Sequence, residues 1–450
     1  MRRRLTKLRA VAVLVALCLQ GCQSMSTLPN EAAVPAPLRD RAALTDRWLA
    51  DRLETLLPQL MRQQGIDMWL LVAREYNEDP VLATMLPATW LGSTRRRTML
   101  MFFDRGAVAG VEGLAVARYA VGDLIEGAWD PATQPDQWAR LAELVAERNP
   151  SRIAVNVSPT FALADGLSAS EHQALLAALG EHAARVVPGE GLAVGWLETR
   201  SDPELAEYPA IVALAHAILA EGLSSAAVEP GVTTTDDLCW WFRERVVQLQ
   251  LETWFHPSVS VQRDSAPAAE GSFAEDDDDA VIRPGDLVHV DFGIRYLGLN
   301  TDTQQHAYVL RPGEQAAPPG LVSALAAGNR LQDLFMAQFV AGRTGNEILA
   351  AALGAAAVEG LDATIYTHPL GLHGHAAGPT IGLWDQQGGV AGTGDYPLFA
   401  NTAYAIELAL AVDVPEWGQP VRIMLEEDAL FDGETVRFLD GRQTELHLIR

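Results

Sequence analysis

Cysteine is scarce in this sequence, which has 3 among its 450 residues. Cys18 falls in a segment that we expect to be removed, and Cys22 stands directly after it. Only Cys239 belongs to the expected folded part, where its apolar neighbours predict a buried core thiol. A disulfide framework and a cysteine-rich zinc site are therefore excluded.

Basic residues are few relative to acidic ones, because 33 Lys and Arg face 58 Asp and Glu, and the formal net charge is -25. The N-terminal segment 1–21 has no acids but holds five cations: Arg2, Arg3, Arg4, Lys7 and Arg9. The rest of the chain is thus more acidic than the whole. Such a surface repels nucleic acid and anionic lipid, so we expect no nucleic-acid partner.

The N-terminal apolar run, Ala10 to Leu19, is shorter than the roughly 20 residues that span a bilayer as a helix. A basic start followed by a short apolar run is typical of a secretory signal peptide, here residues 1–21. The sequence Leu19-Gln20-Gly21-Cys22 resembles the bacterial lipobox, whose cysteine is acylated after cleavage. An ordinary signal with an incidental cysteine is the alternative.

These features predict an exported, periplasmic protein that is anchored by lipid on Cys22, and Gln23, which is not Asp, favours the outer membrane. Residues 22–43 are rich in Ser, Thr, Pro and Ala over most of their length and are predicted to form a flexible tether.

The length of the chain predicts two folded domains. In the first, residues 44–190, strand-like segments alternate with helical ones, which is typical of an α/β domain. The expected strands are 66–72, 98–103 and 152–157, and the expected helices are 48–64 and 136–148. We find no chemical constellation in this domain.

The second domain, residues 191–450, contains an internal repeat. A helix pair at 204–227 and 235–248 is echoed by a pair at 320–339 and 346–359. Strand-like segments with two carboxylates follow each pair, which predicts two related α/β halves around one central site. The alternative is that Ala-rich helices merely look alike.

Five residues of this domain have the chemistry of a metal site: Asp291, Asp302, His368, Glu407 and Glu426. In the strand 287–294, side chains alternate between faces, so Asp291 and His289 lie opposite the apolar residues. Asp302 stands in the next strand, close enough to form a hairpin. An acid in an apolar strand is costly to bury unless it is paired or bound to a cation.

Four carboxylates and one imidazole suit manganese, cobalt, iron or zinc, and we expect manganese first. Carboxylates that bridge two ions about 3.5–4 Å apart can hold a hydroxide between them, which attacks a carbonyl at neutral pH.

The sequence resembles the pita-bread metallopeptidases, which include aminopeptidase P, prolidase, methionine aminopeptidase and creatinase. The resemblance is carried by the Asp291–Asp302 spacing, by His-Pro-Leu-Gly-Leu-His-Gly-His from His368 to His375, by Ala-Ile-Glu407 and by Leu-Glu426-Glu-Asp. It implies a creatinase-type N-terminal α/β domain followed by a pita-bread catalytic domain, and it makes a homodimer a further expectation.

The resemblance also implies a role for each residue. Asp291 would chelate one metal, and Asp302 and Glu426 would bridge two divalent ions. His368 and Glu407 would complete the second position, with Glu407 also acting as general base. His375 would stabilise the oxyanion or the scissile carbonyl, although His373 could take its place after a small loop shift.

Three departures from the family affect the surroundings of the metals. The segment 263–279 lacks the upstream substrate-contacting His of the family, and His256 is the nearest. Gln304 and Gln305 stand where Thr and Arg are common, and Leu408 stands where Pro is typical. His289 and His306 are expected to support or pack against the site and not to bind metal.

The expected function is that of a dinuclear Xaa-Pro aminopeptidase or dipeptidase acting on short peptides. The alternatives are a metallohydrolase of a non-peptide small amide and a catalytically inactive binding lipoprotein on the same fold.

Overall fold

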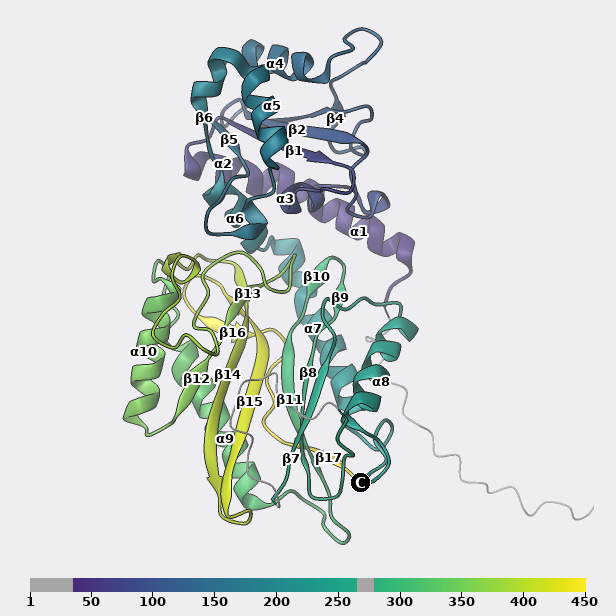
Figure 1. Cartoon of the computed structure of the whole chain (residues 1–450), viewed down its shortest axis with the longest axis vertical. Coiled ribbons are helices and arrows are strands. Elements are labelled where there is room, and N and C mark those ends of the chain that lie inside the picture. The colour runs from purple at the N-terminus through teal and green to yellow at the C-terminus, as the bar shows by residue number, and fades with distance from the viewer. Residues whose placement is uncertain (1–34, 265–278) are drawn as a thin grey trace, which may run out of the picture.

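The computed structural model describes residues 35–264 and 279–450 of the chain. Two domains follow one another along the long axis of the molecule (Figure 1). The expected signal peptide, Cys22 and most of the expected tether lie outside the described residues, as does nearly all of the segment that lacks the upstream His.

The N-terminal domain is built on a six-stranded sheet in the order β4-β3-β2-β1-β5-β6. Its strands are β1 (Met68–Arg74), β2 (Arg97–Asp104), β3 (Val111–Val116), β4 (Glu126–Gly127), β5 (Ile153–Val155) and β6 (Val186–Pro188). Its helices are α1 (Leu38–Asp51), α2 (Leu57–Gln64), α3 (Pro80–Ala83), α4 (Gln137–Arg148), α5 (Ala169–Leu179) and α6 (Glu190–Glu198), with a π-helical turn, Arg52–Leu56, joining α1 to α2.

Helices cover both faces of this sheet, which explains why β1 is an almost continuous apolar run. Successive side chains of β1 point to opposite faces. Trp69 and Leu71 therefore enter the core that contains α2 and α6, whereas Leu70 and Val72 enter the core that contains α4 and α5.

Both ends of this domain differ from the sequence-based boundaries. Helix α1 begins at Leu38, within the expected tether, because Arg39, Arg41 and Ala43 favour a helix and extend the one around Trp48. At the other end, α6 continues the domain beyond residue 190, since its buried residues, including Trp196, join the N-terminal core.

The C-terminal domain is built on a nine-stranded sheet whose main path is β12-β14-β15-β11-β8-β7. Its strands are β7 (Ser258–Gln262), β8 (Leu287–Phe292), β11 (Thr303–Val309), β12 (Ala363–Ile365), β13 (His368–Leu370), β14 (Thr402–Val414), β15 (Gln419–Phe431), β16 (Val436–Phe438) and β17 (His447–Ile449). A separate short hairpin, β9 (Arg295–Tyr296) and β10 (Leu299–Asn300), connects β8 to β11. Its helices are α7 (Asp202–Gly222), α8 (Thr235–Gln248), α9 (Pro319–Met336) and α10 (Gly345–Val358).

The strand order confirms two related halves. One half places β7, β8 and β11 from the edge to the middle of the sheet, and the other places β12, β14 and β15 in the mirrored order. Helices α7 and α8 pack on the first half, and α9 and α10 on the second. The repeat extends to local detail, because α8 and α10 both begin with a capping box, Thr234 with Asp237 and Thr344 with Glu347.

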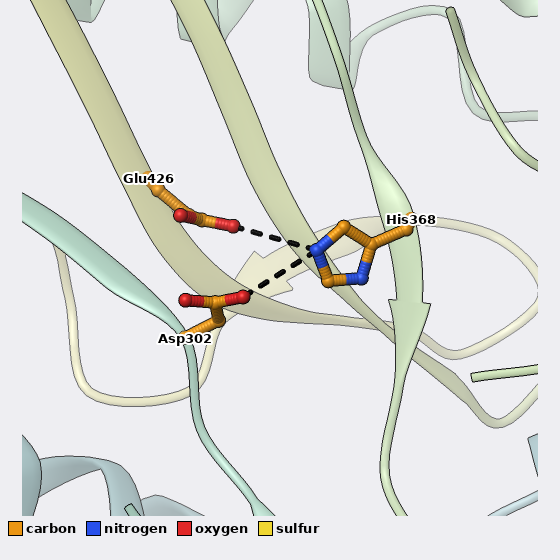
Figure 2. A group of neighbouring side chains, drawn as sticks. All are labelled: Asp302, His368 and Glu426. Atoms are coloured by element: carbon orange, nitrogen blue, oxygen red, sulfur yellow. Dashed lines mark ion pairs between the residues drawn. The ribbon is translucent and has the colours of Figure 1, made fainter. Parts of the chain in front are cut away.

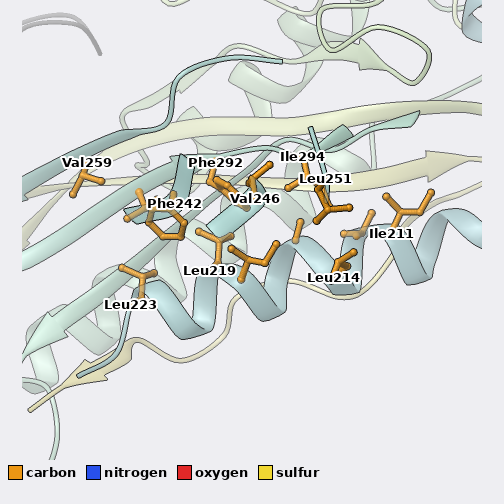
Figure 3. Packing of buried hydrophobic residues seen from close by; sticks show 14 of the residues in the cluster. Ile211, Leu214, Leu219, Leu223, Phe242, Val246, Leu251, Val259, Phe292 and Ile294 are labelled. Atoms are coloured by element: carbon orange, nitrogen blue, oxygen red, sulfur yellow. The ribbon is translucent and has the colours of Figure 1, made fainter. Parts of the chain in front are cut away.

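Helix α7 is held in the core of the first half (Figure 3). By length and composition it would suit a membrane span, and it is the one helix of the described residues that does. However, Ile211, Leu219 and seven further residues of α7 are buried, and the helix packs against Phe242 of α8 and Phe292 of β8. It is therefore a core helix.

Candidate metal centre

One row of residues crosses four neighbouring strands of the C-terminal sheet. Asp291 on β8 pairs with Gln304 on β11, Gln304 pairs with Glu426 on β15, and Glu426 pairs with Glu407 on β14. Directly opposed residues point to the same face of a sheet, so three carboxylates and one amide converge. Asp302 lies two residues before Gln304, just ahead of β11, and joins them.

His368 reaches the same place from β13, which pairs with β14. Its Nε2 atom lies 3.4 Å from Oδ2 of Asp302 and 3.7 Å from Oε1 of Glu426 (Figure 2). All three side chains are buried, and their donor atoms lie within 4.8 Å of one another. Two oxygens and a nitrogen at this spacing could hold one metal ion.

Unpaired oxygen atoms provide a test of whether the residues fit a cation. Oδ1 of Asp291, Oδ1 of Asp302 and Oε1 of Glu426 are buried without a hydrogen-bond partner. Burying an acceptor without a partner costs about 1–3 kcal/mol, and more for a charged group. Because the three atoms belong to neighbouring acids, a divalent cation would satisfy them together. The donor set therefore fits the metals expected from the sequence.

The pKa values of the acids follow from this crowding. Burial raises the pKa of Asp291 to about 7 and that of Glu407 to about 8, and Asp291 adds to the rise at Glu407. Burial, reinforced by the neighbouring acids, raises the pKa values of Asp302 and Glu426 well above their ordinary range. Without a cation some of these groups hold protons at neutral pH, and metal binding would release them.

The imidazole of His368 is in the form that binds metals. Burial, together with the nearby His375, lowers the pKa of His368 to about 3, so its ring is neutral. Its Nδ1 lies 3.0 Å from the carbonyl oxygen of Pro369, to which a protonated Nδ1 donates. This contact leaves the lone pair of Nε2 directed at Asp302 and Glu426.

The acids next to Glu426 have other partners. Glu427 faces the opposite side of β15, where its Oε2 lies 2.8 Å from Nε2 of His216. Asp428 accepts a hydrogen bond from the backbone N–H of Asp302 at 3.1 Å and so fixes the chain there. Of this run, the side chain of Glu426 is the one that faces His368, in agreement with the motif alignment.

The loop after β13 places His375, and not His373, beside His368. The rings of His375 and His368 meet edge to face at 4.5 Å between centroids. His373 instead lies under the electrostatic influence of Arg200 and Arg295, and with burial as the main cause the pKa of its ring is about 4. The alternative in which His373 takes the role of His375 requires a rearranged loop.

Two aromatic side chains near His375 were not predicted from the sequence to belong to the site. The hydroxyl of Tyr366 lies 3.4 Å from Nε2 of His375, and the ring of Trp254 lies 5.1 Å from its centroid. Trp254 packs onto Gly374, where a Cβ atom would lie 2.3 Å from the indole. Tyr366 could have been inferred from its position two residues before His368, but no local signal identifies Trp254.

His289 and His306 do not belong to the cluster of Asp302, His368 and Glu426. His289 is 3.0 Å from the side-chain oxygen of Gln304, and His306 accepts a hydrogen bond from the backbone N–H of Met424. Both therefore support the site and belong outside the donor set. His256 is exposed, and its ring contacts Arg243 and Trp240 of α8.

One family model matches most of the C-terminal domain. Residues 210–430 match the model of metallopeptidase family M24, a span that contains all five expected metal ligands. No curated protein sequence is significantly similar to the chain.

Solved structures share the architecture of both domains. The X-Pro aminopeptidase of Thermotoga maritima is 16% identical over 87% of this chain and 99% of its own, with a TM-score of 0.60. The Xaa-Pro dipeptidase of Bacillus anthracis is 18% identical over 92% and 100%, with a TM-score of 0.56. The prolidase of Pyrococcus furiosus is 13% identical over 86% and 99%, with a TM-score of 0.52. At these identities the likeness establishes the fold.

Proposed function

This chain belongs to metallopeptidase family M24 through its pita-bread C-terminal domain, and from that premise we propose that it is a dinuclear Xaa-Pro aminopeptidase or dipeptidase acting on short peptides. The observation that carries the proposal is the row of acids with unsatisfied buried oxygens beside a neutral His368. A row of buried acids is costly unless the acids are protonated or share a cation, and neighbouring acids with unpartnered oxygens suit a shared cation.

The proposed metal ligands are Asp291, Asp302, His368, Glu407 and Glu426. When bound, divalent ions of this kind polarise a carbonyl and lower the pKa of water, with manganese expected first. The protein supplies the fixed donor positions, since four of the five ligands stand on or next to central strands of the sheet.

His375 is proposed to contact the scissile carbonyl or the developing oxyanion of the substrate. Its side chain is exposed beside the buried His368, where a substrate could reach it. Tyr366 and Trp254 contact its ring. Glu407 is also proposed as the general base, because its carboxylate lies in the row of acids beside the proposed metal positions.

The first experiment combines metal analysis with turnover on the chain lacking residues 1–22. The protein is loaded with Mn²⁺ and assayed with an Xaa-Pro dipeptide and an Xaa-Pro-Yaa tripeptide, beside Asp302→Ala. Asp362→Ala is the matched control, because Asp362 is an exposed acid of the same domain. We expect metal and turnover in the wild type and the control, and the loss of both in Asp302→Ala.

The same experiment separates the alternatives. Turnover of the tripeptide alone identifies an aminopeptidase, and turnover of the dipeptide identifies a dipeptidase. Bound metal without turnover of either peptide points to a non-peptide amide as substrate. Absence of metal at every supplementation contradicts the proposed centre and favours the inactive binding lipoprotein.

Export and lipid anchoring at Cys22 are part of the proposal and rest on the basic and apolar pattern of residues 1–21 and on the lipobox-like sequence. Cell fractionation of the full chain beside Cys22→Ala tests them. Release of the variant from the membrane fraction supports acylation, and an unchanged distribution contradicts it. Light scattering of the purified protein tests the expected homodimer.

A further inference from the structure

A cavity of about 560 Å³ lies in the N-terminal domain. Its walls come from the start of β2, from the segments that follow β3 and β4, and from the first turn of α4. Three arginines and two tryptophans dominate the lining: Arg96, Arg97, Arg118, Trp129 and Trp138. Helix α4 lies at the end of this domain that is far from the C-terminal domain (Figure 1). The cavity is therefore separate from the metal centre.

Two of the three guanidinium groups in the lining have no acidic partner. The side chains of Arg96 and Arg118 are exposed, and neither forms an ion pair within residues 35–264 and 279–450. Arg97 is already paired, since its Nε and Nη2 atoms lie 2.7 Å and 3.1 Å from the carboxylate of Glu171. The arginines that remain available to a ligand are thus Arg96 and Arg118.

The acids nearest to these arginines are engaged by backbone groups. Asp136, which also lines the cavity, accepts hydrogen bonds from the backbone N–H groups of Trp138 and Ala139 at the start of α4. Glu75 accepts the backbone N–H of Arg96 at 3.2 Å. The lining contains three arginines and one acid, although the whole chain has a net charge of -25. This local reversal of charge favours an anionic ligand.

The two tryptophans give the cavity flat apolar walls beside the positive charge. Cζ of Arg118 lies 5.8 Å from the ring centroid of Trp129, and Cζ of Arg97 lies 5.2 Å from that of Trp138. Both indoles are half-buried, because they pack against the core below α4. The indole N–H of Trp129 donates to the carbonyl oxygen of Gln134 at 2.7 Å, which fixes this ring. Fixed indole faces suit a flat apolar group.

Size and chemistry together define the class of ligand. Small-molecule sites in proteins have volumes of about 300–1,000 Å³, and this cavity falls within that range. The planar fork of an arginine matches the oxygens of a carboxylate or a phosphate. A cation would be repelled by the arginines, and a bare inorganic anion would leave the indole faces unused.

We propose that this cavity binds a small organic anion, whose carboxylate or phosphate is held by Arg96 and Arg118 and whose flat apolar body lies against Trp129 and Trp138. It is a second ligand site in a domain without metal-binding residues of the proposed centre. The proposal goes beyond the peptidase function and does not depend on it.

The test is a calorimetric titration of the metal-free chain lacking residues 1–22, in a buffer without carboxylate or phosphate. The probes are N-acetylphenylalanine, phenyl phosphate, the uncharged N-acetylphenylalaninamide and inorganic phosphate. We expect at least one of the two aromatic anions to bind with a Kd below about 1 mM. The uncharged amide and inorganic phosphate should bind at least about 10-fold more weakly, because each lacks one of the two features that the cavity recognises.

Two variants remove the arginines without disturbing the core. Arg118→Gln removes an exposed charge, and Arg96→Asn does the same at a residue whose φ is 55°, a left-handed conformation that asparagine tolerates. Each should weaken the aromatic anion at least about 10-fold. Trp129→Leu should weaken it as well, since the flat wall is lost.

Arg47→Gln is the matched control, because Arg47 is an exposed arginine of α1 outside the cavity lining. It changes the net charge by the same amount as the Arg118 variant, and its binding should match that of the wild type. Thermal melting of every variant establishes that the protein is folded. The two exposed arginines keep the test valid if Trp129→Leu fails to fold.

The outcomes decide the inference and identify the oxyanion. Tighter binding of N-acetylphenylalanine supports a carboxylate ligand, and tighter binding of phenyl phosphate supports a phosphate ligand. The inference is overturned if neither anion binds, if the uncharged amide or inorganic phosphate binds as tightly, or if neither arginine variant weakens binding. Peptide turnover enters none of these results, so the inference and the proposed function can fail separately.

Discussion

Two buried acids of the N-terminal domain and the acids of the metal centre are stabilised in different ways. In the N-terminal domain, the fully buried Asp79 accepts hydrogen bonds from the backbone N–H groups of Val81 and Leu82 and from the amide of Asn156. Glu171, also buried, is paired with Arg97 and Arg74. Each of these acids has partners within its own domain that stabilise its buried oxygens.

The acids of the metal centre are only partly satisfied by such partners. Asp291, Asp302 and Glu426 each keep a buried oxygen without a hydrogen bond, and no Arg or Lys of the described residues forms an ion pair with any of them. Burial alone is therefore a poor indicator of function in this molecule. Unused acceptor capacity, shared by neighbouring acids, separates the metal centre from the structural acids.

Glu198, at the end of α6, is an intermediate case. Its Oε2 is buried without a partner, and burial raises the pKa of its carboxyl group well above the ordinary range. Its surroundings are nevertheless the hydroxyl of Tyr396 and the guanidinium of Arg200. A single acid with these neighbours can be accommodated by protonation, whereas a row of acids calls for a cation.

We expect the largest effects from replacing one acid of the metal centre and one paired acid of the N-terminal domain. Glu426→Gln keeps the shape of the side chain but removes a ligand, so we expect loss of bound metal and a fall in kcat/KM of at least about 1000-fold. The metal-free variant should be no less stable than the metal-free wild type, because a crowded acid has been neutralised. Metal analysis, Xaa-Pro peptide kinetics and thermal melting in a chelator measure the three quantities.

Glu171→Gln is the counterpart in the N-terminal domain. It should keep its metal and the turnover of its folded fraction, yet melt earlier than the wild type, since Arg97 and Arg74 lose their buried partner. If both variants lost metal, or if both lost only stability, the division between the two kinds of acid would be wrong.

The next prediction distinguishes metal binding from substrate contact within the C-terminal domain. His375→Ala should lower kcat about 100-fold to 1000-fold with little change in bound metal, because its ring contacts His368 without joining the donor cluster. Steady-state kinetics on Mn²⁺-loaded protein give kcat, and metal analysis of the same sample gives the occupancy. Loss of metal in this variant would make His375 a ligand.

Asp79→Ala tests the structural acids by stability alone. The variant leaves the N–H groups at the start of α3 and the amide of Asn156 without their acceptor, so we expect a loss of about 2–3 kcal/mol in the free energy of unfolding. Chemical denaturation followed by fluorescence measures it. At denaturant concentrations where the variant is folded, we expect its metal content and turnover to equal those of the wild type. A defect in either would mean that the N-terminal domain contributes to metal binding or catalysis.

The local part of this architecture could be predicted from the sequence. Helix α8, Thr235–Gln248, has the predicted bounds, since its cap and apolar spacing are local signals. The short strand β4 and helix α6 were missed, because an exposed two-residue strand and an apolar helix buried on every side lack a clear period.

The candidate site was likewise predictable only in part from the sequence. The acids could be selected as polar residues in apolar strands, but their alignment depends on sheet register between distant segments. Gln304 lies 122 residues from Glu426 and 103 from Glu407, and it could be identified only as a departure from the family. Trp254 comes from a loop whose course no local pattern specifies.

The smallest expected effect concerns Glu427. This acid belongs to the C-terminal sheet, but it has a charged partner, as Glu171 has in the N-terminal domain. Its partner His216 lies 2.8 Å from it and 2.9 Å from Asp440. Burial opposes the charge on His216, but the hydrogen bonds to Asp440 and Glu427 outweigh it and raise the pKa of His216 from 6.5 to about 10.

Because the pKa of His216 is higher in the folded state than in the unfolded state, the stabilisation is complete below about pH 6.5 and is lost as the pH rises through about 10. His216→Asn should therefore be less stable than the wild type by about 2 kcal/mol at pH 6, and the difference should shrink steadily toward pH 10. Denaturation of both metal-free proteins across this range measures it, and the chelated centre contributes equally to both. A difference that is constant with pH would mean that His216 is neutral, and that Glu427, like Glu426 beside it, lacks a cation of its own.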